Sequence, residues 1–381
     1  MISRVAGNCF WLNRYMERAG SMARLLRVNR SFVPGVDLPH LSRWHPLIVV
    51  AGEEERYKRH FGEDENGETV QEYLTWDRRN STSIVESVRW ARENTRTARE
   101  IVSSEMWETV NSLWHWLQTG PGRRLYRSDR DHFYQHIRQM GELFHGQADE
   151  TMLNGEPLAF MRLGRYLERA GQTARLMDVN YHTFPEEGAI DDPIRLAQWS
   201  ALLRCCSATE PFQKRVFGTP TAREVVGFLL FEPDLPRSVS HCLRAARHSL
   251  VQVRGYGSNR IGMVSTALLE ALLSHVALRE GHTIVGAELH AELTYLVDSV
   301  SDLRSSADTG RSDCASMNSC NSPVVNARSA MRNSASCPLA RRAASGSGGS
   351  LRVMMTKWAI RGGCRSSSAI SAWTAGFTIE W

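Results

Sequence analysis

The stretch "RYMERAGSMARLLRVN" at residues 14–29 recurs almost unchanged as "RYLERAGQTARLMDVN" at residues 165–180. The copies start 165 − 14 = 151 residues apart and share an Arg-Tyr-x-Glu-Arg-Ala-Gly core. Apolar residues in and just before the first copy recur at steps of three and four: Leu12, Met16, Ala19 and Ala23. The second copy keeps this spacing, which is that of one face of an α-helix and not of a strand. Each copy therefore predicts a long helix.

The similarity extends beyond this phrase. "VQEYLTW" (70–76) aligns with "VVGFLLF" (225–231), and "RWAR" (89–92) aligns with "RAAR" (244–247). Because these matches occur in one order along the chain, they predict an internal duplication with halves of about 1–155 and 156–303. The period is much longer than the 20–50 residues of a solenoid repeat. Two similar halves packed together are the simpler prediction.

The rest of the body also has helical periodicity. An apolar stripe runs from Ile84 to Leu117 and predicts one long helix. Ser83 and Glu86 form a capping-box pattern at its start, and "QTGPG" (118–122) ends it. Alternating β-branched segments are scarce. The predicted fold is all-α, a duplicated helical bundle over residues 1–303 with an irregular C-terminal tail.

The tail differs from the body in composition. Residues 302–381 hold ten Lys/Arg and four Asp/Glu, so their formal charge is 10 − 4 = +6. The whole chain carries +5, which leaves 5 − 6 = −1 for residues 1–301. A neutral body gives no electrostatic reason to bind nucleic acid, and we expect no nucleic-acid partner.

Serine occupies 16 of the 80 positions in residues 302–381. Such low complexity predicts disorder. The segment also contains four Cys and three Trp among many Ser, Arg, Ala and Gly residues, a mixture typical of GC-rich DNA translated in the wrong frame. Residues 304–381 are therefore predicted to be a disordered or a frameshifted tail.

Several functional classes lack their sequence signals. None of the eight cysteines forms a C-x-x-C pair, so a zinc knuckle is unsupported. No apolar run approaches the ~20 residues that cross a bilayer. Arg4 and Arg14 interrupt any signal-peptide core. We expect a cytoplasmic protein with no membrane partner and no cofactor. The oligomeric state is left open.

Charged residues occupy the helix face opposite the apolar stripe in both copies: Arg14, Glu17, Arg18, Arg165, Glu168 and Arg169. Leu25 and Leu176 fall on this same side, which predicts that another helix covers it. Three interpretations stay open. The face is a charge-paired helix–helix seam, or it forms two Arg/Glu pockets for an anionic or peptide-like ligand, or it is solvated.

A metal site and a catalytic site find little support. A di-metal helical bundle needs two Glu-x-x-His motifs, and only Glu142 and His145 provide one. We expect no bound metal. Phosphate-binding loops, the G-x-S-x-G motif and the H-E-x-x-H motif do not occur. These observations favour a protein that is not an enzyme, without deciding the question.

Longer stretches resemble a known family. "MISRVAGNCFWLNRYMERAG" (1–20), "AFMRLGRYLERAGQTARLMDVNY" (159–181) and "NSTSIVESVRWARENTRTAREIVSSEMWETVN" (80–111) look like the bacterial alpha-E domain family, with similarity over about residues 1–300. The resemblance implies an all-helical cytoplasmic protein. It also implies neighbouring genes for a circularly permuted ATP-grasp protein and a transglutaminase-like peptidase.

That context implies a helical accessory or scaffold protein in a pathway of peptide synthesis or modification. Its partner would be the ATP-grasp amide ligase or the peptide product. The alternative is an enzyme of the same pathway that uses its Glu/Arg clusters for acid–base chemistry on an amide.

The resemblance also marks candidate residues for binding a ligand or partner: Arg14, Glu17, Arg18, Glu93, Asn94, Glu105, Arg165, Glu168 and Arg169. No catalytic residue is assigned. The family phrase usually continues Glu-Arg-Ala with an acidic residue, whereas this chain has Gly20 and Gly171.

Overall fold

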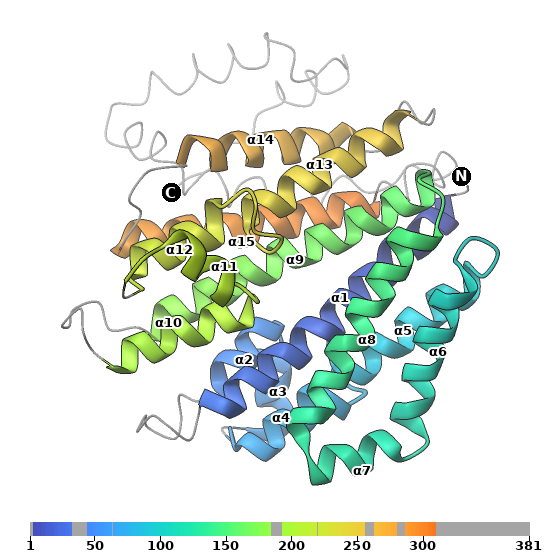
Figure 1. Ribbon diagram of the computed structural model, residues 1–381, viewed down its shortest axis with the longest axis horizontal. Coiled ribbons are helices and arrows are strands. Elements are labelled where there is room, and N and C mark those ends of the chain that lie inside the picture. The colour runs from blue at the N-terminus through green and yellow to red at the C-terminus, as the bar shows by residue number, and fades with distance from the viewer. Residues whose placement is uncertain are drawn as a thin grey trace, which may run out of the picture. The chain divides into compact units, whose positions relative to one another are not determined.

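The computed structural model describes residues 3–32, 44–62, 64–183, 193–218, 220–255, 263–279 and 286–309. Within these ranges the chain forms fifteen helices and no strand (Figure 1), so the predicted all-α class is confirmed. The last helix extends past the predicted domain boundary at Leu303 and ends at Thr309. The predicted tail from residue 310 onward lies outside the described residues.

The fifteen helices can be described in two groups along the chain. The first group begins with the long helix α1 and the second with the long helix α9. The first group is α1 (Ser3–Phe32), α2 (His45–Ala51), α3 (Glu54–Phe61), α4 (Gly67–Trp76), α5 (Ile84–Thr97), α6 (Ser104–Gln118), α7 (Pro121–Ser128) and α8 (Arg130–Thr151). The second group is α9 (Glu156–Thr183), α10 (Pro193–Cys205), α11 (Thr209–Arg215), α12 (Ala222–Phe231), α13 (Val239–Gly255), α14 (Met263–Arg279) and α15 (Gly286–Thr309).

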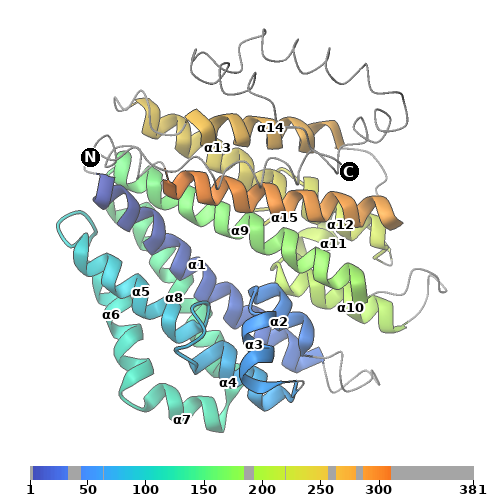
Figure 2. The ribbon, with the colours of Figure 1, turned by 180° about the vertical axis from the view of Figure 1, so that it is seen from behind.

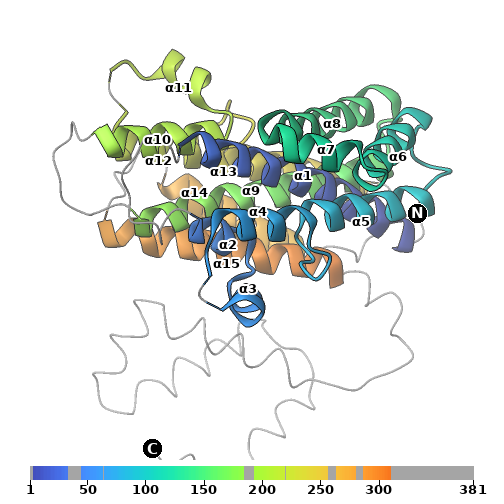
Figure 3. The same ribbon diagram turned by 90° about the horizontal axis from the view of Figure 1, so that it is seen from below.

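Helices α1 and α9 pack side by side and run through the centre of the described body (Figures 1 and 2). Helices α5 and α8 flank α1, and helices α13 and α15 flank α9. Helix α14 contacts both α13 and α15, and α6 contacts α5 and α8. Figure 3 shows the short helix α3 projecting away from the long helices. The repeated phrase therefore supplies the two central helices.

The prediction of one continuous helix from Ile84 to Leu117 was wrong. Helix α5 ends at Thr97 and α6 begins at Ser104. Ser103 provides a second N-cap, because its hydroxyl accepts a hydrogen bond from the backbone N–H of Met106 at 3.3 Å. The break lets α5 pack against α1 while α6 packs against α8. A stripe of apolar residues does not reveal such a turn.

The buried apolar side chains form two clusters. One is made mainly of residues from α1 to α8, with Leu158 and Met161 of α9, and the other mainly of residues from α9 to α15, with Phe10 of α1 and Val50 of α2. Gly164 allows α1 and α9 to approach closely, since a Cβ there would overlap the carbonyl oxygen of Phe10. The charged face of the repeated phrase lies at this crossing, between the two clusters.

Candidate functional site

The charged faces of α1 and α9 meet and pair with each other. We call this set the Glu-Arg seam: Arg14, Glu17 and Arg18 on α1, with Arg165, Glu168 and Arg169 on α9. Glu17 is 3% exposed and Glu168 is 2% exposed. The prediction that another helix covers this face is confirmed. A carboxylate buried to this degree requires charged or hydrogen-bonded partners.

Glu168 receives two guanidinium groups from α1. Arg14 donates from Nε and Nη2 to Oε2 at 3.0 and 2.9 Å. Arg18 donates from Nε to Oε1 at 2.8 Å and from Nη2 to Oε2 at 3.2 Å. The contact of Arg18 is therefore bidentate, the geometry in which the planar fork of arginine matches a carboxylate.

Glu17 is paired in the opposite direction. Arg169 of α9 donates from Nε to Oε1 at 3.1 Å and from Nη2 to Oε2 at 2.8 Å. Arg237, which precedes α13, donates from Nη1 to Oε1 at 2.9 Å. Ser21 adds its hydroxyl at 3.2 Å. Each copy of the phrase thus provides the carboxylate for the arginines of the other copy.

Residues outside the repeated phrase complete the two sites differently. His145 of α8 places Nε2 3.3 Å from Glu17 Oε2, in contact but outside hydrogen-bond geometry. Arg304 of α15 places Nη1 3.5 Å from Glu168 Oε2. Inside the phrase, Gln172 stands at the position equivalent to Ser21 and donates to Glu168 Oε1 at 3.3 Å. Each carboxylate therefore accepts from the arginine that follows the opposite glutamate, Arg18 for Glu168 and Arg169 for Glu17, and the remaining partners differ.

The electrostatics follow from this pairing. Burial alone would raise the pKa of Glu17, but the charges of Arg169 and Arg237 outweigh it and hold that pKa well below its usual range. Burial would also raise the pKa of Glu168. The charges of Arg18 and Arg14 outweigh this effect and hold that pKa well below its usual range. Both groups are ionised at neutral pH, so neither is poised to act as a general acid or base.

His145 is neutral for the opposite reason. Burial, together with the nearby charge of Arg165, lowers its pKa from 6.5 to about 4, although Glu17 acts in the other direction. The imidazole therefore adds no positive charge beside Glu17 near pH 7.

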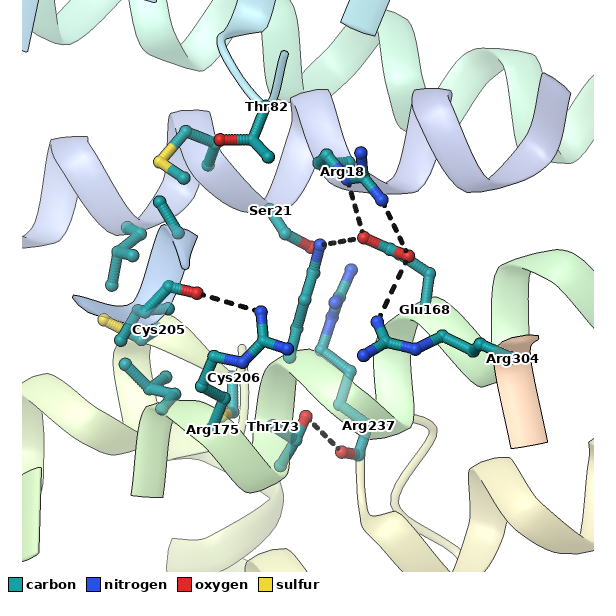
Figure 4. Close-up of a pocket in the computed structure, with 16 residues that line it drawn as sticks. Arg18, Ser21, Thr82, Glu168, Thr173, Arg175, Cys205, Cys206, Arg237 and Arg304 are labelled. Carbon is teal, nitrogen blue, oxygen red and sulfur yellow. Dashed lines mark hydrogen bonds and ion pairs between the residues drawn. The ribbon is translucent and has the colours of Figure 1, made fainter. Parts of the chain in front are cut away.

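A cavity of about 100 Å³ lies beside Glu168. Figure 4 shows guanidinium groups from several elements directed into one space around Glu168. Four arginines and one glutamate are its charged lining residues: Arg18, Arg175, Arg237, Arg304 and Glu168. Glu17 does not line this cavity. The space is several times what one water molecule needs.

A comparison with known families places the chain in one of them. A family model described as "a predicted alpha-helical domain with a conserved ER motif" matches residues 1–308. The Glu-Arg dipeptides of the seam, at residues 17–18 and 168–169, agree with that description. The chain belongs to the Alpha-E family. The resemblance stated from the sequence is confirmed.

Relatives with curated sequences are longer proteins. The chain is 25% identical over 275 residues to an uncharacterized protein of Mycobacterium bovis and to uncharacterized proteins of two strains of Mycobacterium tuberculosis. Each match covers 68% of this chain and 30% of the relative. The chain thus spans less than a third of the length of these relatives. No solved structure matches it.

In this Alpha-E chain, six of the nine candidate residues meet in the Glu-Arg seam. Arg165 has the longest contact with a carboxylate of the seam, since its Nε lies 4.0 Å from Glu17 Oε2. Its Nη1 lies 3.4 Å from Asp149. The other three candidates lie elsewhere: Glu93 and Asn94 on α5, and Glu105 in the first turn of α6.

These three residues have local surroundings. Glu93 pairs with Arg96 at 2.9 Å and with Arg92 at 3.2 Å on its own helix. Asn94 donates to the carbonyl oxygen of Trp90 at 2.7 Å. Glu105 is exposed. None of the three lines the cavity beside Glu168.

Three residues that contact the seam were not predicted: His145, Arg237 and Arg304. His145 appeared in the sequence only as half of a metal motif. Arg304 fell one residue beyond the predicted domain boundary. Arg237 follows a proline and has no periodic signal. Only the tertiary arrangement brings these side chains to the two carboxylates.

A metal site has no support among the described residues, where no group of three or more His, Cys, Asp and Glu is placed to hold an ion. The two members of the Glu-x-x-His motif have separate contacts. Glu142 pairs with Arg138 at 3.0 Å, whereas His145 contacts Glu17. In the same part of the chain, no helix has the length and apolar character that a membrane crossing requires.

Proposed function

We propose that this Alpha-E protein is a non-catalytic helical accessory protein, which serves as a scaffold for an ATP-grasp amide ligase and a transglutaminase-like peptidase. The pathway would make or modify amide-linked peptides. The observation that carries the non-catalytic part is the pairing of Glu17 and Glu168. Each buried carboxylate is occupied by at least two guanidinium groups, so the seam supports a rigid joint between α1 and α9.

The proposed partners rest on two supports. The family resemblance implies neighbouring genes for the ligase and the peptidase. In addition, the matched region fills only 30% of the mycobacterial relatives, so their helical region is joined to further chain. A domain that is fused to further chain in its relatives is expected to act together with other domains or proteins. We extend the proposal to a cytoplasmic location on the same resemblance.

The internal duplication and the two halves of residues 1–303 also remain proposals. The order of contacts supports them. Helix α1 packs against α5, and α9 packs against α13, which begins at the residue aligned with the start of α5. The two Glu-Arg dipeptides at equivalent positions support the same view.

An enzyme of the same pathway is the alternative. Acid–base chemistry on an amide needs a carboxyl group whose pKa lies near the working pH. Glu17 and Glu168 have pKa values well below the usual range. Asp298 on α15 has a pKa raised by burial and by the nearby Asp302 and Asp178, but it does not line the cavity. These observations favour the scaffold.

Co-expression of the full chain with the neighbouring ATP-grasp protein tests the proposal. We expect the two proteins to elute together in size-exclusion chromatography, and an ATP-grasp ligase from an unrelated pathway to elute separately. Elution of the chain by itself, at protein concentrations of tens of micromolar, would contradict the scaffold role. Turnover of an amide substrate by the purified chain alone would favour the enzyme.

A further inference from the structure

The cavity beside Glu168 is lined by more positive charge than its one carboxylate neutralises. Four guanidinium groups line it, and we call it the arginine cavity: Arg18, Arg175, Arg237 and Arg304. We infer that the arginine cavity is a binding site for a small ligand with one oxyanion group, a carboxylate or a phosphate. This inference concerns a ligand of the chain itself and does not depend on a partner protein.

The charge balance of the seam supports an anionic ligand. Six guanidinium groups lie within 4.0 Å of the two buried carboxylates, which leaves 6 − 2 = +4: Arg14, Arg18, Arg165, Arg169, Arg237 and Arg304. Arg165 shares part of its charge with Asp149. Even without it, three charges remain unmatched. Buried cations in excess are unfavourable unless an anion joins them.

Arg175 differs from the other three arginines of the cavity, each of which has a salt bridge to Glu17 or Glu168. Its Nη1 donates to the backbone carbonyl of Val50 at 3.3 Å. No carboxylate among the described residues forms a salt bridge with it. Burial lowers the pKa of Arg175. The charge of Glu168 raises this pKa and the charge of Arg18 lowers it, and the net shift is downward. Figure 4 shows its guanidinium directed into the cavity. It therefore has donors available for a ligand.

Two further arginines have the same imbalance. Burial lowers the pKa of Arg237 to about 9 although Glu17 contacts it, and the charges of Arg24 and Arg169 contribute to this lowering. Arg24 is 5% exposed, and its Nε and Nη1 have no hydrogen-bond partner. Its ion pair with the half-exposed Glu142 is long, at 3.6 Å. Arg237 lines the cavity, stays protonated at neutral pH and would gain from an anion there; Arg24 lies outside the cavity lining and adds to the positive charge around it.

The remaining walls limit the size and shape of the ligand. Leu25, Val50 and Leu176 supply apolar surface beside the guanidinium groups, and the thiols of Cys205 and Cys206 add to it. An oxyanion would accept paired N–H donors from the arginines, as carboxylate and phosphate both do. The apolar side would accommodate a short hydrocarbon group. A cavity of about 100 Å³ fits a small molecule or the end of a chain.

Isothermal titration of the full chain at low ionic strength tests this inference, since salt screens such sites. Three probes separate the ligand sources: inorganic phosphate, N-acetylalanine and the neutral N-acetylalaninamide. We expect saturable binding of at least one anion and no binding of the amide. Tighter binding of N-acetylalanine would identify a carboxylate ligand, and tighter binding of phosphate would identify a phosphate ligand.

Variants locate the site. Arg175→Gln should weaken the binding of the anion by about tenfold or more, because a charged hydrogen bond contributes about 1.5–3 kcal/mol. Arg162→Gln is the matched control, since Arg162 lies on the same helix about 20 Å away and pairs with Asp149. Its affinity for the anion should equal that of the wild type.

A second variant tests the same site by adding a negative charge to the cavity wall, where Arg175→Gln removes a positive one. A Cβ at Gly171 would lie 3.1 Å from Nη1 of Arg304, the end of a flexible side chain, and 3.3 Å from Cγ1 of Val300, which would have to shift by a few tenths of an ångström. Gly171→Asp should therefore place a carboxylate beside Arg304, keep the fold and weaken anion binding at least tenfold. The inference is overturned if the wild type binds neither anion at millimolar concentration. It is also overturned if Arg175→Gln and Gly171→Asp, shown to be folded by thermal unfolding, bind as the wild type does.

Discussion

Glu17 and Glu168 occupy the same position in the two copies of one phrase, yet the molecule surrounds them differently. Both are buried; Glu168 accepts hydrogen bonds from two arginines of the opposite helix and Glu17 accepts them from one. Glu17 is closed in by His145 of α8 and lines no part of the cavity. Glu168 faces the cavity and has Arg304 as a further neighbour.

The repeated phrase and the surrounding helices determine different properties of these two carboxylates. The repeated phrase determines the reciprocal pairing, because two similar helices that cross present the same charges to each other. The helices outside the phrase determine whether a carboxylate is enclosed or open to a cavity. A rigid joint and a candidate ligand site can therefore arise from one motif.

The largest loss of stability is expected on replacement of Glu17, the carboxylate enclosed by His145. Glu17→Gln would leave the buried Arg169 and the partly buried Arg237 without their negative partner, which costs about 3–5 kcal/mol. Urea unfolding of the purified protein measures this loss. Glu93→Gln is the control, since it removes a half-exposed helix pair that contributes at most ~0.5 kcal/mol. Equal losses for the two variants would argue against a structural seam.

A pH-dependent loss of stability should come from His145. Its pKa is about 4 in the folded chain and 6.5 when free, so between these values the unfolded chain binds more protons. Stability therefore falls as the pH drops from about 6.5 to about 4, by roughly 3 kcal/mol at 1.4 kcal/mol per unit. His145→Gln should remove most of this slope, and replacement of the exposed His132 should not. An unchanged slope in His145→Gln would mean that the imidazole is not buried as described.

A smaller effect is expected at the carboxylate beside the cavity. Glu168→Gln should cost about 1–3 kcal/mol, less than Glu17→Gln, because water in the cavity can solvate the freed arginines. The same urea experiment measures it. Added phosphate should restore more stability to Glu168→Gln than to Glu17→Gln. A greater loss at Glu168 than at Glu17 would reverse the proposed contrast between an enclosed and an open site.

The sequence predicted the helical class and the covered charged face because both follow from local periodicity. Arg14, Glu17 and Arg18 recur with the same spacing at the second copy, so their pairing with α9 was one of three stated interpretations. Leu25 on the charged side was the useful signal, since a solvated face has little reason to keep a leucine there.

Other features could not be predicted from the sequence. The break at Ser103 depends on where α6 finds a packing surface, and the apolar stripe continues through it. Arg237 and Arg304 come from a loop and from the end of α15, far along the chain from both copies of the phrase. The contrast between Glu17 and Glu168 depends on these residues, and therefore on tertiary contacts that no local pattern encodes.

The most direct test of the seam is a double-mutant cycle between Glu17 and Arg169, measured by urea unfolding of Glu17→Gln, Arg169→Gln and the double variant. If the two side chains pair across α1 and α9, the double variant should lose about 2 kcal/mol less than the sum of the single losses. Additive losses, within about 0.5 kcal/mol, would contradict the pairing on which the description of this site depends.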